Sequence, residues 1–191
     1  SFDNAIVVGA GFGLSTKQLL DAGATVTSLE PAQSRYDLLE TNCANGTNYR
    51  KSAGSLAGDE ILYGWSDNLS QAVVGKNQGN NTQNVEVVTI DSLELNPDLL
   101  IVFANGKELD VLAGASATMT ANPNMKIVLW WKPDYLEDVD DAVNELQALG
   151  KTIKIIHWEP EGDAISYYEQ FTGEYADDSL KAVHTATLLL E

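Results

Sequence analysis

Cysteine is nearly missing from this sequence, in which Cys43 is the single cysteine among 191 residues. One thiol cannot form an intramolecular disulfide, which excludes the class of secreted domains held together by disulfides. No apolar run approaches the roughly 18–20 residues that a membrane span needs, and the first residues do not resemble a signal peptide. We therefore expect a cytoplasmic protein with no membrane partner. The first residue is Ser rather than Met, which indicates processing or excision and leaves room for an upstream signal or domain.

Basic side chains are also few. The chain has 11 Lys and Arg residues against 28 Asp and Glu residues, a formal net charge of −17. Nucleic acids and anionic membranes are bound by clustered Lys and Arg, so neither is expected as a partner. The charge favours solubility and says nothing about the fold.

Metal-binding patterns are missing from the sequence as well. No Cys/His spacing of a zinc site is present, nor a P-loop or a G-x-S-x-G nucleophile elbow. The acidic run at residues 137–141 fits the first turn of a helix, where the helix dipole favours negative charge, better than it fits a cation site. We expect no metal site.

What the sequence does contain is an alternation of short apolar runs with amphipathic segments, which is typical of an α/β sheet. At about 100–200 residues per domain, residues 1–191 are expected to form a single domain. The polar, Gly-rich segment at residues 75–84 is expected to be a mobile loop. Helices are predicted at residues 106–121 and 136–149, and strands at residues 5–8, 24–29, 49–52, 60–65, 85–90, 98–104, 126–131, 151–158 and 182–190.

The sharpest local signal is a glycine turn between the first strand and the first helix. Gly9, Gly11 and Gly13 allow a tight turn and a close approach of the backbone to a ligand, next to the free N–H groups of a helix start. Glu30 lies at the end of the second strand, where an acid can accept hydrogen bonds from both hydroxyls of a ribose. Together these residues predict a nucleoside-containing cofactor.

The spacing of the glycines discriminates between cofactors. A dinucleotide fingerprint, G-x-G-x-x-G, would need its third glycine where the chain has Leu14, which argues against a nicotinamide-dependent oxidoreductase. The pattern present, G-x-G-x-G, resembles the first motif of class I methyltransferases that use S-adenosylmethionine. A turn that serves only strand-to-helix geometry remains the alternative.

Four segments resemble the FkbM family of methyltransferases, in order and with compatible spacing. Residues 100–115, LIVFANGKELDVLAGA, resemble the family pattern L-K-I-D-V-E-G-A-E-x-x-V-L-x-G-A. Residues 9–13 resemble its V-G-A-N-x-G turn, and residues 89–93 resemble its T-L-D-x-L element. Residues 28–31 resemble its F-E-P element, which is followed in the next helix by Tyr36, Leu38, Leu39 and Asn42 where the family has F-x-L-L-x-x-N. The similarity extends from about residue 6 to about residue 162.

This resemblance implies a doubly wound, Rossmann-like methyltransferase domain with a mostly parallel seven-stranded sheet, in which residues 182–190 form an antiparallel C-terminal strand. It implies S-adenosylmethionine as the cofactor and O-methylation of a sugar or small-molecule hydroxyl, so that the partner is a small-molecule or glycan substrate. The cofactor-binding residues that it implies are Gly9, Ala10, Gly11, Phe12, Gly13, Glu30 and Pro31.

The departures from the family pattern suggest an alternative. Val7 replaces the acid that opens the glycine motif, and Phe103 and Asn105 replace the Asp and Glu of I-D-V-E-G. Phe103 cannot accept a hydrogen bond, and the amide of Asn105 is neutral. The chain is therefore either a methyltransferase with altered chemistry or a non-catalytic module that keeps the fold for binding or assembly.

Methyl transfer to a hydroxyl needs an in-line nucleophile and a base. The candidates near the carboxyl ends of strands are Asp91, Glu108, His157 and Glu159, although a structural role for His157 is the simpler interpretation. Asn105 either orients the acceptor or cofactor through its amide or caps a helix that begins near Gly106. Of the adjacent Trp130 and Trp131, at most one can face a pocket, because neighbouring strand residues point to opposite faces of a sheet.

Overall fold

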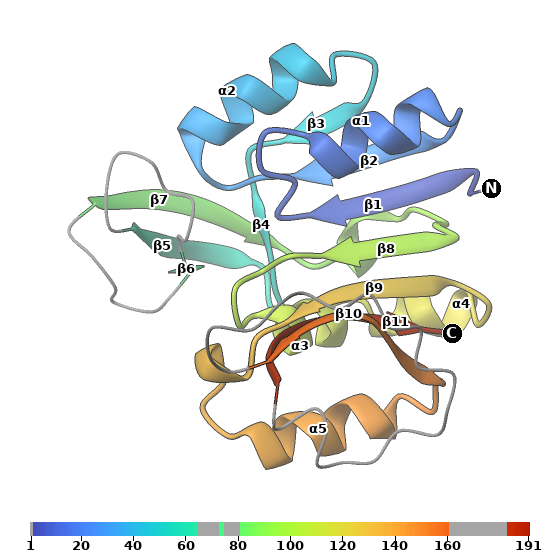
Figure 1. Ribbon diagram of the computed structural model, residues 1–191. Helices are drawn as coiled ribbons and strands as arrows, with labels where there is room; N and C mark the ends of the chain where they lie inside the picture. The colour runs from blue at the N-terminus through green and yellow to red at the C-terminus, as the bar shows by residue number, and fades with distance from the viewer. Residues whose placement is uncertain (1, 65–72, 75–80, 161–182) are drawn as a thin grey trace.

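The computed structural model describes residues 2–64, 73–74, 81–160 and 183–191. Its main sheet has seven strands in the order β10-β11-β9-β8-β1-β2-β3. All neighbours pair in parallel except β11, which runs antiparallel to both β9 and β10 (Figure 1). The strands are β1 (Asn4–Val8), β2 (Thr25–Leu29), β3 (Thr47–Tyr49), β8 (Leu99–Val102), β9 (Lys126–Trp131), β10 (Ile153–Pro160) and β11 (Val183–Leu190).

This sheet confirms the predicted fold class. The register pairs Ile6 of β1 with Thr27 of β2 and with Leu100 of β8, so the first two predicted strands are parallel neighbours. The predicted C-terminal strand is antiparallel and inserted next to the parallel set. Apolar runs such as Leu99–Val102 form central strands because both of their faces are covered.

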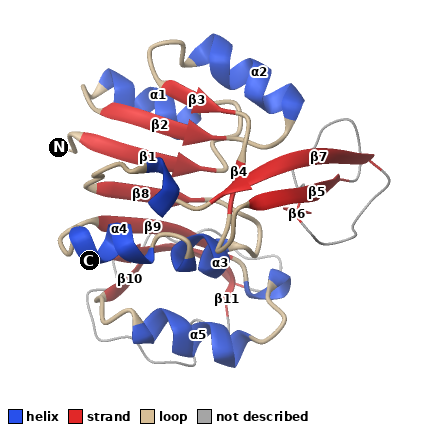
Figure 2. Ribbon diagram, turned by 180° about the vertical axis from the view of Figure 1, so that it is seen from behind, coloured by secondary structure: helices blue, strands red, loops and turns tan. Residues whose placement is uncertain are grey.

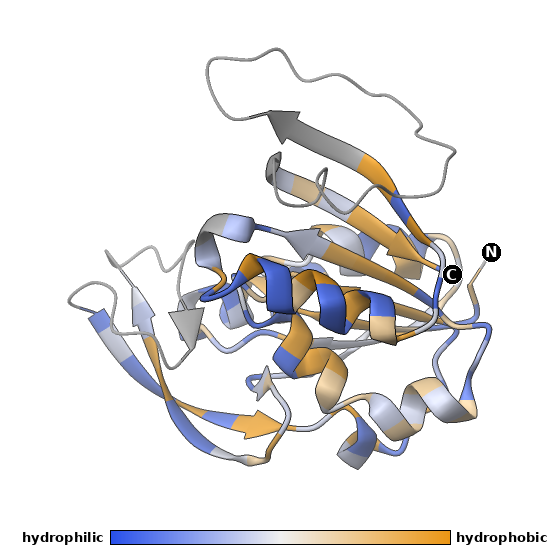
Figure 3. Ribbon diagram, turned by 90° about the horizontal axis from the view of Figure 1, so that it is seen from below, coloured by the Kyte–Doolittle hydropathy of each residue, from blue (hydrophilic) through white to orange (hydrophobic). Residues whose placement is uncertain are grey.

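Helices cover both faces of the main sheet. They are α1 (Leu14–Asp21), α2 (Gln33–Asn42), α3 (Glu108–Ala113), α4 (Ser116–Ala121) and α5 (Val139–Ala148). Val8 and Val102 pack in a core with residues of α3 and α5, whereas Val7 and Ile101 pack with residues of α1 and α2. Figure 2 shows α3 and α4 in front of the sheet, and Figure 3 shows how apolar its strands are.

A second sheet of four strands was not predicted. It has the order β4-β7-β5-β6 and lies at the carboxyl ends of β1 and β8 (Figure 1). Its strands are β4 (Ser52–Ala53), β5 (Gly58–Gly64), β6 (Val73–Val74) and β7 (Asn81–Val88). The single strand expected at residues 49–52 is wrong, because β3 ends at Tyr49 in the main sheet and β4 begins at Ser52 in the second sheet.

The loop expected at residues 75–84 is partly wrong. Residues 81–84 belong to β7 and pair antiparallel with residues 61–64 of β5. The polar side chains of residues 81–84 show no apolar alternation, so the sequence did not indicate a strand. Pairing with β5 nevertheless satisfies their backbone hydrogen bonds at this exposed end of the sheet. Residues 75–80 lie outside the described part of the chain.

The single helix expected at residues 106–121 is two helices. The break falls at Gly114, where a Cβ atom would lie 2.0 Å from the carbonyl oxygen of Gly54. This contact brings the segment before β5 against the end of α3, and α4 then begins as a separate helix at Ser116.

The acidic run at residues 137–141 is confirmed as the start of a helix, α5. Asp138 is its N-cap residue, and Asp138 Oδ1 accepts hydrogen bonds from the amides of Asp140 (2.9 Å) and Asp141 (3.0 Å).

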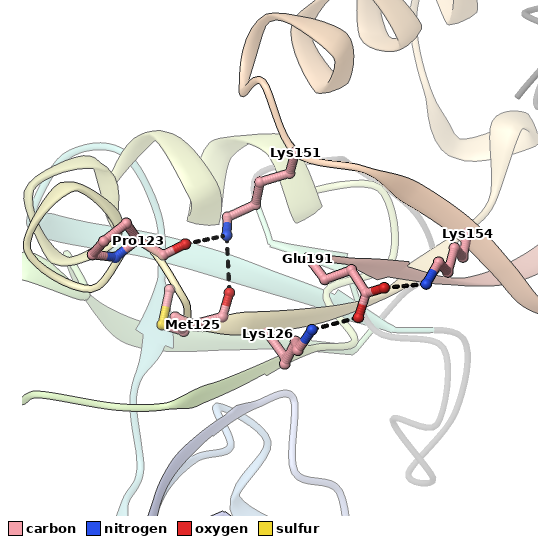
Figure 4. Close-up of polar contacts among 6 residues, drawn as sticks. All are labelled: Pro123, Met125, Lys126, Lys151, Lys154 and Glu191. Atoms are coloured by element: carbon pink, nitrogen blue, oxygen red, sulfur yellow. Dashed lines mark hydrogen bonds and ion pairs between the residues drawn. The ribbon is translucent and has the colours of Figure 1, made fainter. Parts of the chain in front are cut away.

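Charged side chains join the strands at the end of the main sheet opposite the carboxyl ends of β1 and β8. Glu191, just after β11, accepts hydrogen bonds from Lys126 of β9 and Lys154 of β10 (Figure 4). Lys151 Nζ donates to the carbonyl oxygens of Pro123 (3.2 Å) and Met125 (2.9 Å). These contacts hold β9, β10 and β11 together far from the carboxyl ends of β1 and β8.

The described residues include neither a candidate membrane span nor a metal-binding cluster. No helix there has both the length and the apolar character of a membrane span. Likewise, no group of three or more His, Cys, Asp or Glu side chains in the described ranges is arranged to hold a metal ion.

Candidate functional site

A cavity opens where the strand order of the main sheet reverses, between the carboxyl ends of β1 and β8. The space between its walls, counted together with the solvent at its open mouth, is about 520 Å³. Ligands of open α/β sheets bind at this switch point. The cavity is lined by Val8, Gly9, Glu30, Pro31, Arg35, Phe103, Ala104, Asn105 and Lys107, and by Ser52 and Leu62 of the second sheet.

Two of the three glycines in the turn are required by the fold itself. A Cβ atom on Gly9 would lie 2.0 Å from the carbonyl oxygen of Phe103, and one on Gly13 would lie 2.6 Å from Cys43 Sγ. Both residues also have positive φ angles, 71° and 98°. The alternative that the turn serves strand-to-helix geometry therefore holds for Gly9 and Gly13.

Gly11 has a different environment. Its φ is 59°, and the nearest atom to a Cβ there would be the Arg35 guanidinium at 4.0 Å. Its amide donates a 2.8 Å hydrogen bond to Glu30 Oε2. The turn thus presents its backbone to the carboxylate at the end of β2, so the glycine turn and Glu30 lie side by side.

Glu30 is almost fully buried, and its other oxygen, Oε1, accepts a 2.9 Å hydrogen bond from the amide of Ala32. Burial raises the pKa of Glu30, against the opposing effect of these two amides and of the nearby Arg35. A carboxylate has about four lone-pair positions. Two backbone amides leave capacity for two further donors, which is what a ribose would supply.

The other predicted cofactor residues are placed unequally. Pro31 lines the cavity beside Glu30, whereas Ala10 is buried beneath the turn. Phe12 is 54% exposed, and its carbonyl oxygen accepts a hydrogen bond from the Asn42 amide group at 2.8 Å. The structure therefore brings Gly9, Gly11, Glu30 and Pro31 together and leaves Phe12 on the outer side of the turn.

The second wall of the cavity is the loop between β8 and α3. Asn105 lines the cavity in a left-handed conformation, with φ of 51°, and Gly106 follows with φ of 90°. The helix α3 starts at Glu108 with Lys107 as its N-cap residue, so the alternative that Asn105 caps the helix is wrong. Asn is one of the few residues that tolerate this conformation beside a ligand.

Glu108 has a role that sequence reasoning missed. Its side chain is 1% exposed and turns back onto its own loop, where Oε1 accepts from the amide of Ala104 (2.9 Å) and Oε2 from that of Gly106 (2.8 Å). Burial raises the pKa of Glu108 to about 7, although the backbone amides oppose the shift. Glu108 is therefore placed to shape the wall of the cavity, and its oxygens do not face the cavity as those of a base would.

Asp91 does not line the cavity. It lies in a short 3-10 helix (Asp91–Leu93) and accepts hydrogen bonds from the amides of Ala117 and Thr118 at the start of α4, at 3.0 and 2.8 Å. Burial acts to raise the pKa of Asp91, but these bonds and that of the Thr118 hydroxyl outweigh it and lower the pKa. His157 lies on β10, and its side chain is outside the described part of the structure.

Two adjacent tryptophans at the end of β9 separate as expected. Trp131 is buried in the core, while the ring of Trp130 meets that of Phe103 edge to face, with centroids 6.0 Å apart. Phe103 itself lines the cavity. An aromatic wall thus stands where the family pattern has a carboxylate.

Comparisons with known proteins agree on the fold. No family model matches the sequence, and no curated protein is similar to it in sequence. Among solved structures, the FkbM methyltransferase from Methylobacillus flagellatus is similar over 99% of this chain, with a TM-score of 0.61 and 14% sequence identity. A TehB-like SAM-dependent methyltransferase from Corynebacterium glutamicum is similar over 98% of this chain, with a TM-score of 0.51 and 8% identity.

The chain spans 43% of the length of the FkbM structure and 79% of the TehB-like one. At these identities the likeness concerns the course of the backbone and not the chemistry of the side chains. The strand order, the antiparallel β11 and the cavity at the switch point agree with it. The chain has the fold of S-adenosylmethionine-dependent methyltransferases.

Proposed function

We propose that this protein is an S-adenosylmethionine-dependent methyltransferase that methylates a hydroxyl group of a sugar or another small molecule. The observation that carries the proposal is the hydrogen bond from the Gly11 amide to Glu30, which lines the cavity. It joins a glycine turn to a buried acid at the carboxyl edge of the sheet, the arrangement that binds nucleoside ligands in such folds. The fold likeness to methyltransferases supports the same conclusion.

The residues present fit the cofactor. Glu30 would accept hydrogen bonds from the ribose hydroxyls, and the open backbone at Gly11 would allow a close approach of the ligand. Arg35 and Lys107 line the cavity and can pair with a carboxylate on the amino-acid tail of the cofactor.

The bound cofactor, held by Glu30 and the turn at Gly11, would supply an electrophilic methyl group for an acceptor oxygen, with a neutral thioether as the leaving group. The protein must align the acceptor and exclude water. Phe103 and Trp130 supply an apolar wall for both purposes. The hydroxyl proton must also leave, and His157 stays a predicted base for it.

A second candidate function is a non-catalytic module that binds a nucleoside ligand. It is favoured by the three departures from the family pattern, which the structure places in or beside the site. Val7 is fully buried in the core, Phe103 stacks edge-on against Trp130, and Asn105 is neutral. None of these three can serve as a carboxylate ligand or a base.

Titration calorimetry with S-adenosylmethionine and S-adenosylhomocysteine tests the proposal. We expect micromolar binding of both, and Glu30→Gln should weaken binding by about 1–3 kcal/mol, the cost of an incompletely satisfied buried group. Glu145→Gln, an exposed acid on α5, is the matched control. Absence of binding for both ligands would overturn the proposal. Tight binding without methyl transfer to any hydroxyl acceptor would favour the non-catalytic module.

A further inference from the structure

Three aromatic rings and one lysine gather next to the cavity, at the carboxyl ends of β8 and β9. Phe103 meets Trp130 edge to face, with ring centroids 6.0 Å apart. Lys132 Nζ lies 4.6 Å from the ring centroid of Trp130 and 4.7 Å from that of Tyr135. We call Phe103, Trp130, Lys132 and Tyr135 the aromatic–lysine cluster. Because Phe103 belongs to both, the cluster continues the wall of the cavity.

The cluster is held in place from two sides. The indole N–H of Trp130 donates a 2.8 Å hydrogen bond to the hydroxyl of Thr185 in β11. Tyr135 packs so closely on the β8–α3 loop that a Cβ atom on Gly106 would lie 2.7 Å from Tyr135 Cβ. The loop that carries Asn105 and the segment that carries Tyr135 therefore form one surface.

Lys132 is a cation placed between two ring faces. None of the ion pairs found among the described residues includes it, whereas Lys107 pairs with Asp110 at 3.7 Å. Ring faces attract an ammonium ion but accept its hydrogen bonds weakly, so its N–H donors keep capacity for a stronger acceptor. The chain has a net charge of −17, so a lysine beside the cavity that forms no ion pair with the described acids is an unusual feature of this surface.

We propose that the aromatic–lysine cluster is the acceptor subsite and that Lys132 binds a negatively charged group of the acceptor, a carboxylate or a phosphate. The inference deepens the proposed function, on which it rests. An acceptor ring beside Phe103 would place its hydroxyl toward the cavity, while its anionic group pairs with Lys132. The acidic remainder of the protein does not prevent this, because salt screens charges beyond about 8 Å at physiological ionic strength.

Paired probes that differ by one anionic group test the proposal: glucuronate against glucose, glucose 6-phosphate against glucose, and 4-hydroxybenzoate against 4-hydroxybenzyl alcohol. Their affinities are measured by calorimetry with and without saturating S-adenosylhomocysteine. We expect at least one anionic probe to bind about tenfold more tightly than its neutral partner, the effect of one charged hydrogen bond. The carboxylate and phosphate pairs show which anion the subsite takes.

Three variants assign the effect. Lys132→Met should remove the preference for the anionic probe while binding of S-adenosylhomocysteine is kept, and Lys132→Arg should restore most of the preference. Lys17→Met, which removes the same charge from the exposed face of α1, should leave it unchanged.

Each failure points to one proposal. If S-adenosylhomocysteine binds but no pair shows a preference that depends on Lys132, the acceptor subsite is overturned and the proposed function stands. If the preference is present but S-adenosylhomocysteine does not bind, the anion subsite stands and the methyltransferase function is overturned.

Discussion

Gly9 and Phe103 are in direct backbone contact: a Cβ atom on Gly9 would lie 2.0 Å from the carbonyl oxygen of Phe103. The amide of Phe103 also donates a 2.9 Å hydrogen bond to the carbonyl oxygen of Val8. The ends of β1 and β8 therefore meet at a point that has no room for a side chain, directly beneath the cavity.

Gly9→Ala is expected to lower the free energy of unfolding by about 2–4 kcal/mol, because it adds an overlap with Phe103 to the cost of a positive φ. Gly23→Ala is the matched control. Gly23 also has a positive φ, 93°, but a Cβ atom there meets nothing within 4 Å, so a loss of about 1 kcal/mol is expected. Urea unfolding measures both. Equal losses would show that the contact between β1 and β8 adjusts without cost.

Asn105 allows its backbone conformation and its amide to be tested separately. Asn105→Gly keeps the left-handed conformation, with its φ of 51°, and should leave stability nearly unchanged. Asn105→Ala should cost about 1 kcal/mol, because Ala tolerates that conformation poorly. If the amide orients the acceptor or the cofactor, Asn105→Gly should lower ligand affinity or turnover even though the protein is stable. Unchanged binding and turnover would leave Asn105 with the conformational role alone.

Glu108 should make the stability depend on pH. The pKa of Glu108 is raised to about 7 in the folded protein from an ordinary value of 4.5, so the folded state holds the proton more tightly than the unfolded one. Its contribution to stability is therefore full below pH 4.5 and is lost as the pH rises through 7. Glu108→Gln should remove this component, and the difference in unfolding free energy between wild type and variant should change by about 1–3 kcal/mol between pH 5 and pH 8.

The same urea titrations on Glu145→Gln control for charge, since Glu145 is exposed on α5. A constant difference in unfolding free energy between wild type and Glu108→Gln over this range would contradict the prediction. It would mean that Glu108 is ionised throughout and that the backbone amides of the loop stabilise its carboxylate.

Glu191 should act with the opposite sign. The hydrogen bonds from Lys126 and Lys154 lower the pKa of Glu191 to about 2 from 4.5. Its contribution to stability is therefore present above pH 4.5 and is lost as the pH falls through 2. Glu191→Gln should lower Tm at pH 7, and the difference should shrink in 1 M salt. A difference in Tm that is insensitive to salt would assign the effect to packing instead of charge.

The main sheet and the first half of the site could be predicted because their signals are local. The run Leu99–Val102 is apolar at every position, as a strand covered on both faces must be. The glycine turn and Glu30 each follow a strand, and parallel pairing of β1 with β2 brings the two strand ends together. The order of elements along the chain was enough to place Gly11 beside Glu30.

The second half of the site depends on contacts between segments far apart in sequence. The ring of Phe103 contacts that of Trp130, which lies 27 residues further along the chain. Trp130 in turn donates a hydrogen bond to Thr185, another 55 residues further along. No spacing rule connects such residues. The role of Glu108 was hidden for a different reason, since its partners are backbone amides, which every residue except Pro supplies and which no pattern of side chains reveals.

The place of β11 between β9 and β10 has a consequence for biosynthesis. β10 is made before β11 but pairs with β11 alone among the described strands, and β9 has β11 as its outer neighbour. While the chain emerges from the ribosome, the outer edge of β9 (Lys126–Trp131), with its two tryptophans, must therefore wait unpaired until residues 183–190 are available. Such an edge is a template for pairing with other chains. The β1–β2–β3 half can assemble during translation. Closure of the other half is deferred until β11 has left the exit tunnel, and until then the edge of β9 stays open to pairing with other chains.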